Sequence, residues 1–273
     1  MDKIAIVILN WNGQHFLEKF LPSVTAFSTQ AIIYVADNGS TDHSIDFLKT
    51  EYPNIRIIQL KENYGFCQGY NKALEKIKAE YYVILNSDIE VTPGWLSAPV
   101  SYLDENPDAA AVQPKIRSFH NKKLLEHAGA AGGFIDVLGF PFCRGRLFLS
   151  VEEDNKKFND TIDIFWASGA ALIIRAAVFH KAGGFATDFF AHMEEIDLCW
   201  RIKNIGYRIV YCGESQVYHV GGGTLPKSNP RKTFLNFRNG LGILVKNLPL
   251  RLLFPILFLR MLLDTVAAIQ FFI

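Results

Sequence analysis

The sequence predicts an α/β fold with a mostly parallel central sheet flanked by helices. Short apolar runs alternate with helical stretches through the first hundred residues, which is the pattern of successive βαβ units. The apolar runs are nearly continuous, as expected for strands that are buried on both faces. Polar clusters rich in Asn, Asp and Gly follow these runs, and parallel sheets bind their ligands beyond the carboxyl ends of the strands.

The first half of the chain contains four of these strands in order. We expect them at residues 4–9, 32–36, 55–60 and 81–85. We expect helices at about 14–27, at 42–51 after a turn that supplies an N-cap, and at about 66–79. The strand ends then bring four polar segments together as neighbours: Asn10–Asn12, Asp37–Gly39, Asn63–Gly65 and Asn86–Asp88.

The second half is less regular. We expect strands at 109–116, 165–174 and 207–220, a glycine- and aromatic-rich loop region at 129–142, and a helix that begins near Met193 or Glu194. The chain has no repeat, low-complexity tract or linker. We therefore expect one domain over residues 1–240, with halves at about 1–90 and 91–240, and an appendage over 241–273.

The bulk composition excludes several classes of protein. A net charge of +1 gives no electrostatic basis for binding nucleic acid. The four cysteines show neither a CxxC pair nor a zinc spacing, so we expect reduced thiols in a cytosolic protein. The N-terminus leads directly into a strand of about six apolar residues, and we expect no signal peptide there.

The C-terminal appendage is strongly apolar. From Leu252 to Ile273 only Arg260, Asp264, Thr265 and Gln270 interrupt the apolar run. A charge at mid-membrane costs about 2.5–3.5 kcal/mol, which favours a helix in the membrane interface over a spanning one.

The basic residues Lys246, Arg251 and Arg260 are placed to meet anionic headgroups. The alternative is a helix packed on the domain or on a second copy, which would make a homo-oligomer. The final Phe-Phe-Ile suggests that the sequence ends within a longer chain.

The usual nucleotide-binding loops are absent from the strand ends. No Gly-x-Gly-x-x-Gly follows the first strand, and no Gly-x-x-x-x-Gly-Lys-Ser/Thr occurs. Asp37 offers another way to bind a nucleotide, because an acid at the end of the second strand can accept a hydrogen bond from a ribose hydroxyl or a base N–H. Its alternative role is to cap the turn Asp-Asn-Gly.

A second polar pair ends the strand at 81–85. Asn86 and Asp88 are spaced i, i+2 and project from the same side of the chain. Mg²⁺ and Mn²⁺ take oxygen ligands and commonly use one or two carboxylates together with substrate phosphates. A metal site at Asp88 therefore competes with an ordinary turn aspartate.

Three carboxylates begin the helix near residue 194. Helical geometry pairs Asp197 with Arg201 at i, i+4 and makes Glu194 a first-turn acid favoured by the helix dipole. Glu195 stands above an apolar stripe that should face inward. Partial burial raises the pKa of an acid toward working pH, so Glu195 is the candidate general base, with Glu194 its rival and a buried cap the alternative.

The motifs in this order resemble the family-2 inverting glycosyltransferases, in particular rhamnosyltransferase-like members. The resemblance runs from about residue 3 to 240. The matching segments are Val7–Gly13, Val35–Asp42, Asn63–Asn71, Leu85–Asp88, Gly169–Arg175, Gly183–Phe185, Glu194–Arg201 and His219–Thr224. The resemblance implies a GT-A fold with a Rossmann-like nucleotide half, a nucleotide-diphosphate-sugar donor, a divalent metal (Mg or Mn) and single displacement with inversion.

The resemblance also implies roles for individual residues. Asp37 contacts the base and ribose; the nucleotide-sugar pocket is formed by Asn10, Asn12, Asn63, Gly65, Asn71, Asn86, Ser87, Asp88 and Arg238. Asp88 is the expected metal ligand, and His219 is a further metal or diphosphate contact. Glu195 falls where the family places its catalytic aspartate. Arg238 is expected to reach the leaving diphosphate.

Two residues depart from the family pattern. Asn86 replaces the first acid of Asp-x-Asp, so metal binding is expected to be weaker or to depend more on His219. The base is Glu195 instead of Asp, one methylene longer. Trp166, Phe189 and Phe190 are candidates for an acceptor platform, together with Glu194 and Glu195, although aromatic residues at such positions are more often core.

We therefore expect a sugar transferase at the cytoplasmic face of the cell membrane, acting on a lipid-linked or glycan acceptor in cell-surface polysaccharide synthesis. Two alternatives come from other classes. One is a sugar-phosphate nucleotidyltransferase, which the missing phosphate loop disfavours. The other is a non-catalytic, membrane-associated protein that binds nucleotide sugar, and Asn86 is its only support.

Overall fold

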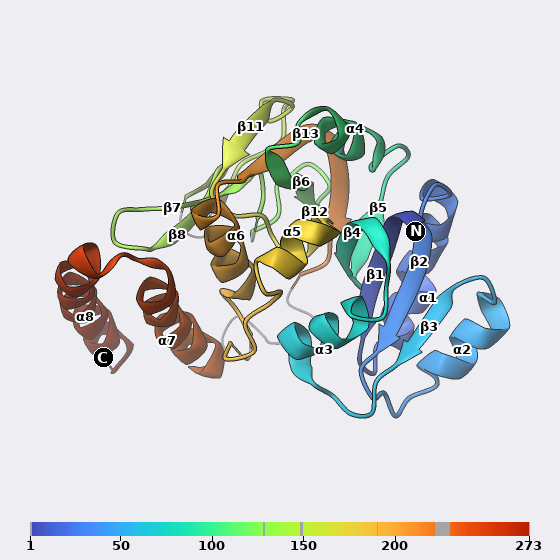
Figure 1. Ribbon diagram of the computed structural model, residues 1–273, viewed down its shortest axis with the longest axis horizontal. Helices are drawn as coiled ribbons and strands as arrows, with labels where there is room; N and C mark the ends of the chain where they lie inside the picture. Colours follow the sequence, from blue (N-terminus) through green and yellow to red (C-terminus); the bar gives the residue numbers. More distant parts are fainter. Residues whose placement is uncertain (1, 128, 148–149, 190, 222–229, 273) are drawn as a thin grey trace.

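A computed structural model describes residues 2–127, 129–147, 150–189, 191–221 and 230–272 (Figure 1). Its first six strands are β1 (Asp2–Asn10), β2 (Ile32–Asp37), β3 (Arg56–Gln59), β4 (Ala79–Asn86), β5 (Ile89–Val91) and β6 (Ala109–Ser118). The others are β7 (Gly133–Ile135), β8 (Pro141–Cys143), β9 (Arg146–Leu147), β10 (Ser150–Val151), β11 (Thr161–Ile164), β12 (Ala171–Arg175) and β13 (Arg208–His219).

Helices alternate with the strands in the first half and gather at the end of the chain. They are α1 (Gln14–Phe27), α2 (Ser44–Glu51), α3 (Gly65–Leu74), α4 (Ser97–Glu105), α5 (Ala176–Lys181), α6 (Glu194–Asn204), α7 (Pro230–Asn247) and α8 (Leu250–Phe272). α1 shows why such segments fold: its buried residues recur at helical spacing and form one inward stripe.

The central sheet has the strand order β11-β13-β6-β12-β4-β1-β2-β3, with β5 paired to β13. The strands β3, β2, β1 and β4 are parallel, and so are β6 and β13. β12 runs antiparallel between β4 and β6. The predicted α/β class with a mixed, mostly parallel sheet is confirmed, and one sheet runs through both predicted halves of the domain.

The core consists of two apolar layers, one on each face of this sheet. Side chains of α1, α2 and α4 pack on one face, and those of α3, α5, α6 and α7 pack on the other. Because both faces are covered, the centres of inner strands such as β1 and β4 are buried, as the unbroken apolar runs predicted. The functional groups are therefore confined to strand ends and loops.

Two predicted elements differ from the structure. The helix expected over 66–79 ends at Leu74, because a tight turn then places Ile77 in the core before β4 begins. The strand expected over 165–174 begins only at Ala171. Before it, Trp166 pairs with Gly133, and this bends the chain away from the sheet.

The C-terminal appendage is a helical hairpin at one end of the molecule, beside the β7–β8 hairpin and far from α1 and α2 (Figure 1). α8 packs on α7 and on the β7–β8 loop. Arg260, expected at headgroups, is only 2% exposed. Its Nη1 donates to the carbonyl of Leu138 at 3.0 Å, and its guanidinium lies 3.7 Å from the centre of the Phe140 ring. The headgroup prediction is therefore wrong for Arg260.

The predicted apolar C-terminal helix is confirmed. Residues Leu250–Ile269 are long and apolar enough to cross a membrane, and only 11% of that stretch is buried. Lys246, the second cation expected at headgroups, lies 3.8 Å from Asp188 and packs over the Phe189 ring. Arg251 is exposed.

Candidate active site

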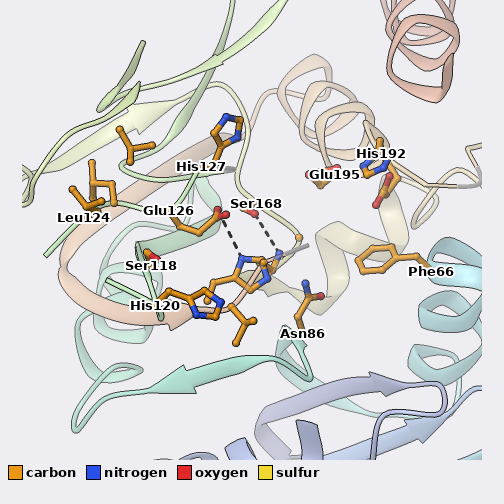
Figure 2. A pocket seen from close by; sticks show the side chains of 18 residues that line it. Phe66, Asn86, Ser118, His120, Leu124, Glu126, His127, Ser168, His192 and Glu195 are labelled. Atoms are coloured by element: carbon orange, nitrogen blue, oxygen red, sulfur yellow. Dashed lines mark hydrogen bonds and ion pairs between the residues drawn. The ribbon is translucent and has the colours of Figure 1, made fainter. Parts of the chain in front are cut away.

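A cavity of about 430 Å³ opens beyond the carboxyl end of β4, where β13, the start of α6 and the segment 118–127 meet. Figure 2 shows Glu126 on one side of it, Glu195, His192 and Phe66 on the other, and Asn86 between them. Its polar lining also includes Ser168, Glu194 and His219. Among the described residues no Lys or Arg lines this cavity, whereas three glutamates do.

A carboxylate–imidazole–carboxylate row lies at one wall. Nε2 of His219 is 3.2 Å from Oδ1 of Asp88, and its Nδ1 is 3.8 Å from Oε2 of Glu126. Burial disfavours the imidazolium, but the interactions with the carboxylates of Asp88 and Glu126 outweigh it and raise the pKa of His219 to about 10. Burial likewise opposes ionisation of Asp88, and the contact with His219 nevertheless lowers its pKa.

Strand pairing brings this row together. β4 ends at Asn86, the chain turns, and β5 pairs antiparallel with the end of β13, which places Ile89 opposite His219. Two hydrogen bonds from backbone N–H groups to Asp88 tighten the turn. The N–H of Gly221 donates to Oδ2 of Asp88, and the N–H of Val220 donates to the backbone carbonyl of Asp88. Ile89 and His219 are 130 residues apart in the sequence, and the pairing of β5 with β13 brings them together.

Two adjacent carboxylates form the opposite wall. α6 begins at Glu194, as predicted, and both Glu194 and Glu195 line the cavity. In each, Oε2 is buried and accepts no hydrogen bond among the described residues. Burial first, and then the charge of Glu195, raises the pKa of Glu194 well above its usual value; burial raises the pKa of Glu195 to about 6.

The start of α6 is held in a costly conformation. His192 and Met193 both have positive φ, 68° and 72°, and residues other than Gly rarely adopt this region. Asn239 of α7 stabilises it by donating through Nδ2 to the carbonyls of Ala191 and His192, both at 2.8 Å. α7 thus fixes the direction in which the two glutamates point.

The third acid of this segment is structural. Asp197 is fully buried and forms the predicted pair with Arg201, at 2.8 Å. Its other oxygen accepts from Nδ2 of Asn247 at 2.9 Å. Unlike the two glutamates, Asp197 has partners on both oxygens.

The strand ends of β1 and β2 carry a second polar group, apart from the cavity. Nδ2 of Asn10 donates to Asp37 at 3.3 Å, and the N–H of Ser40 donates to the other oxygen of Asp37 at 3.1 Å. Oδ1 of Asn12 accepts from the N–H of Thr41 at 2.7 Å. The structure therefore shows the turn-capping role for Asp37; its contact with a nucleotide stays a prediction.

The loop after β3 is joined to the same group. Nδ2 of Asn38 donates to Oδ1 of Asn63 at 3.0 Å and to the carbonyl of Gly65 at 3.1 Å. Gly39 meets this loop closely: it has φ +74°, and a Cβ there would lie 2.7 Å from the backbone of Glu62. The four predicted strand-end segments are thus neighbours.

Three further predicted residues lie away from the cavity. Both polar groups of Asn71 bond to the backbone of Phe185, at 2.8 and 2.9 Å. Arg238 is exposed and donates to the carbonyl of Asp188 and to Asn239. Ser87 is partly exposed and does not line the cavity.

The proposed aromatic platform is corrected by the structure. Trp166 is 5% exposed, its Nε1 donates to the carbonyl of Phe134 at 2.8 Å, and its ring packs on Gly133. Phe189 is also buried in the core. Phe190 lies outside the described residues. Trp166 and Phe189 therefore fill the core, as aromatic residues in loops frequently do.

The structure brings Asn86, Glu194, Glu195 and His219 to the lining of one cavity, and Asp88 contacts His219. Sequence reasoning missed Glu126, His192 and Asn239 there. Glu126 sits in an irregular segment without a motif, and no local signal marks it. Asn239 had a usable signal, because it follows Arg238 in a segment that we had already singled out.

Comparisons with known proteins agree with this geometry. The model of the family described as "Glycosyl transferase family 2" matches residues 5–183. N-acetylglucosaminyl-diphospho-decaprenol L-rhamnosyltransferase of Mycobacterium tuberculosis is 26% identical, over 80% of this chain and 76% of its own length. Rhamnosyltransferase WbbL of Escherichia coli K12 is 22% identical, over 79% of this chain and 83% of its own.

Among solved structures, GalNAc-T7 with UDP, GalNAc and Mn²⁺ superposes with a TM-score of 0.69 at 16% identity. The match covers 89% of this chain and 47% of that one, so this chain corresponds to about half of the solved structure. The likeness shows the fold, and the predicted GT-A fold is confirmed.

Proposed function

The chain belongs to glycosyl transferase family 2, and we propose that it moves a sugar from a nucleotide-diphosphate sugar to a lipid-linked or glycan acceptor, with inversion. Its named relatives are rhamnosyltransferases, one of them acting on a diphospho-decaprenol lipid, which supports a deoxyhexosyl donor and a role in cell-surface polysaccharide synthesis. The observation that carries the proposal is the pair of buried, unpartnered carboxylate oxygens facing the cavity beside Asp88 and His219.

In this proposal Glu195 is the general base. The acceptor hydroxyl oxygen attacks the anomeric carbon, its proton passes to Oε2 of Glu195, and the bond to the nucleoside diphosphate breaks with the electron pair leaving on the diphosphate. Oε2 has the lone pairs for this step because no other described group occupies them. A pKa of about 6 leaves Glu195 mostly ionised near neutral pH while keeping it basic enough to accept a proton.

A divalent cation would be held at the opposite wall by Asp88 and by Nε2 of His219, and the imidazole would have to release its proton to bind it. The cavity wall offers carboxylate oxygen and imidazole nitrogen, which suit Mg²⁺ or Mn²⁺. The described residues contain no group of three side chains able to hold a metal, so phosphate oxygens of the donor must complete the coordination. A bound cation would neutralise charge on the leaving diphosphate, which the acidic lining cannot do.

Glu126 supports this wall. Its carboxylate faces Nδ1 of His219 and so selects the orientation in which Nε2 points toward Asp88. We propose that Asp37, Asn10 and Asn63 shape the nucleotide end of the site through the loops that they hold. The resemblance also assigns donor contacts to Asn71 and Arg238, whose side chains hydrogen-bond to other groups of the chain and would have to exchange those bonds to reach a donor.

We also propose that the enzyme works at the inner face of the cell membrane. Its exposed apolar helix α8 and a lipid-linked acceptor would both be found there. The alternative is that α8 packs against a second copy of the chain and forms a homo-oligomer through the same surface.

The proposal is tested by donor binding and transfer on one preparation. Nucleotide-diphosphate sugars are screened by thermal shift with Mn²⁺ and with chelator, since a ligand that binds only the native state raises the midpoint. Transfer of labelled sugar to a lipid-linked acceptor is then measured. We expect a donor whose binding requires Mn²⁺ and whose sugar reaches the acceptor.

Other outcomes identify the alternatives. Release of inorganic diphosphate from a nucleoside triphosphate with a sugar phosphate would indicate a nucleotidyltransferase. Donor binding without transfer to any acceptor would indicate a non-catalytic binding protein. If the donor binds equally well with Mn²⁺ and with chelator, no metal takes part in donor binding. The His219 imidazolium would then be the cation of the site.

A further inference from the structure

The helix α8 presents far more apolar surface than one protein contact can use. Ten of its large apolar side chains are exposed, among them Leu250, Phe254, Phe258, Leu262, Val266 and Ile269. At about 100° per residue, these exposed side chains cover roughly 220° of the helix circumference. A helix packed against a single protein face buries an apolar stripe of only about 100°.

The remaining sector of α8 faces the protein. Leu253 and Arg260 are buried, and Asp264 lies beside Arg260, with 3.5 Å between Nε and Oδ1. The two charges that interrupt the apolar run therefore point toward α7 and the β7–β8 loop. Because both charges are buried against the protein, the rest of the helix can contact lipid without placing a charge there.

The same packing argues against a spanning helix. Arg260 lies near the middle of α8 and donates to the carbonyl of Leu138 in the β7–β8 loop. The neighbouring Asp136 is exposed. If α8 crossed a bilayer, this loop and its carboxylate would lie near the bilayer centre, where a charge is costly.

Charge at this end of the chain matches a lipid surface. From Pro230 to Ile273 the sequence has six basic residues and one acidic residue. Arg260 and Asp264 pair with each other and Lys246 lies beside Asp188, which leaves exposed cations such as Arg251 at the start of α8. Basic segments beside an apolar helix are attracted to anionic headgroups.

We propose that α8 lies along the surface of an anionic membrane, with its exposed apolar sector in the upper acyl region and the β7–β8 loop at headgroup level. This inference rests on the proposed membrane placement of the enzyme and adds the orientation. The helix is about 34 Å long and would lie parallel to the membrane plane.

Depth measurements test the orientation. Spin labels are attached to Leu250→Cys, Phe258→Cys and Val266→Cys in the full chain bound to vesicles that contain anionic lipid. The four native cysteines are free and buried, so selective labelling of the new cysteine is checked on the wild type. We expect similar, shallow depths at all three positions. A steady gradient, up to about 24 Å between residues 250 and 266, would overturn the proposal in favour of a spanning helix.

Vesicle binding tests the surface itself. The double variant Phe254→Glu/Phe258→Glu should bind anionic vesicles at least about tenfold more weakly than the wild type. The control is Phe27→Glu, which changes an exposed aromatic residue at the end of α1. α1 lies far from α8 in the molecule (Figure 1). Unchanged binding of the double variant would contradict the proposal. So would a dimer that dissociates in the double variant when the wild type fails to bind vesicles, because a second copy would then cover α8.

Donor binding separates this inference from the proposed function. The double variant should bind donor and transfer to a water-soluble acceptor like the wild type, since α8 does not line the cavity. If the wild type shows no transfer but its vesicle binding and label depths are as expected, the membrane inference stands and the proposed reaction fails.

Discussion

The strand-end loops and the cavity wall at α6 use buried polar groups in opposite ways. In the loops, Asn10, Asp37 and Asn38 exchange hydrogen bonds with one another's segments, and these bonds fix the backbone. At the cavity, Glu194 and Glu195 each have one buried carboxylate oxygen without a hydrogen-bond partner among the described residues. A buried carboxylate without partners costs free energy, so its presence beside a cavity indicates a group kept for a ligand or a proton.

The largest effect on donor binding is expected at the metal wall. Asp88→Ala should weaken metal-dependent donor binding by about 100-fold, because it removes the one carboxylate proposed as a direct ligand. Isothermal titration of the donor with Mn²⁺ and with chelator measures this. Asp46→Ala, an exposed acid of α2, is the matched control. If Asp88→Ala binds donor as tightly as the control does, Asp88 belongs with the structural groups.

The loops should respond through stability. Asn38→Ala removes three hydrogen bonds from a residue that is 2% exposed, so we expect a loss of about 2–3 kcal/mol in the free energy of unfolding. Urea denaturation checks this, with the exposed Asn54→Ala as a control that should change stability by less than about 0.5 kcal/mol. Equal stability of the two variants would show that the loop network is not structural.

A smaller change of opposite sign is expected at the cavity. The folded-state pKa of Glu195 is raised from 4.5 to about 6, so its ionisation removes stability as the pH rises through this window. Glu195→Gln should therefore stabilise the protein by about 2 kcal/mol at pH 8 and by little at pH 4.5. Denaturation at both pH values measures the difference. A Gln variant less stable than the wild type at pH 8 would mean that the carboxylate has a partner.

Much of the fold was predictable from the sequence because buried parallel strands and their helices leave local patterns. The strands β1, β2 and β4 and the start of α6 follow directly from apolar runs and turn residues. The segment 165–170 was not predictable, because Trp166 pairs with Gly133, more than thirty residues away. Periodicity does not carry that information.

The site was predictable where a motif placed chemistry at a strand end or a helix start. Asp88, Glu195 and His219 are such residues: Glu195 and His219 line one cavity, and Asp88 contacts His219. Glu126 could not be found, because only the fold moves its segment next to β13. Trp166 and Arg260 were misplaced for a related reason: composition marks an aromatic or a charge, but tertiary packing decides which way it faces.

The central claim is that Glu195 takes the proton of the acceptor hydroxyl. The most direct test is the rate of sugar transfer under saturating donor for the wild type, Glu195→Gln and Glu194→Gln, with donor affinity measured on the same samples. We expect Glu195→Gln to lose about 10²–10⁴-fold in rate with donor affinity unchanged, and Glu194→Gln to lose much less. Full activity of Glu195→Gln, or the larger loss in Glu194→Gln, would contradict the assignment.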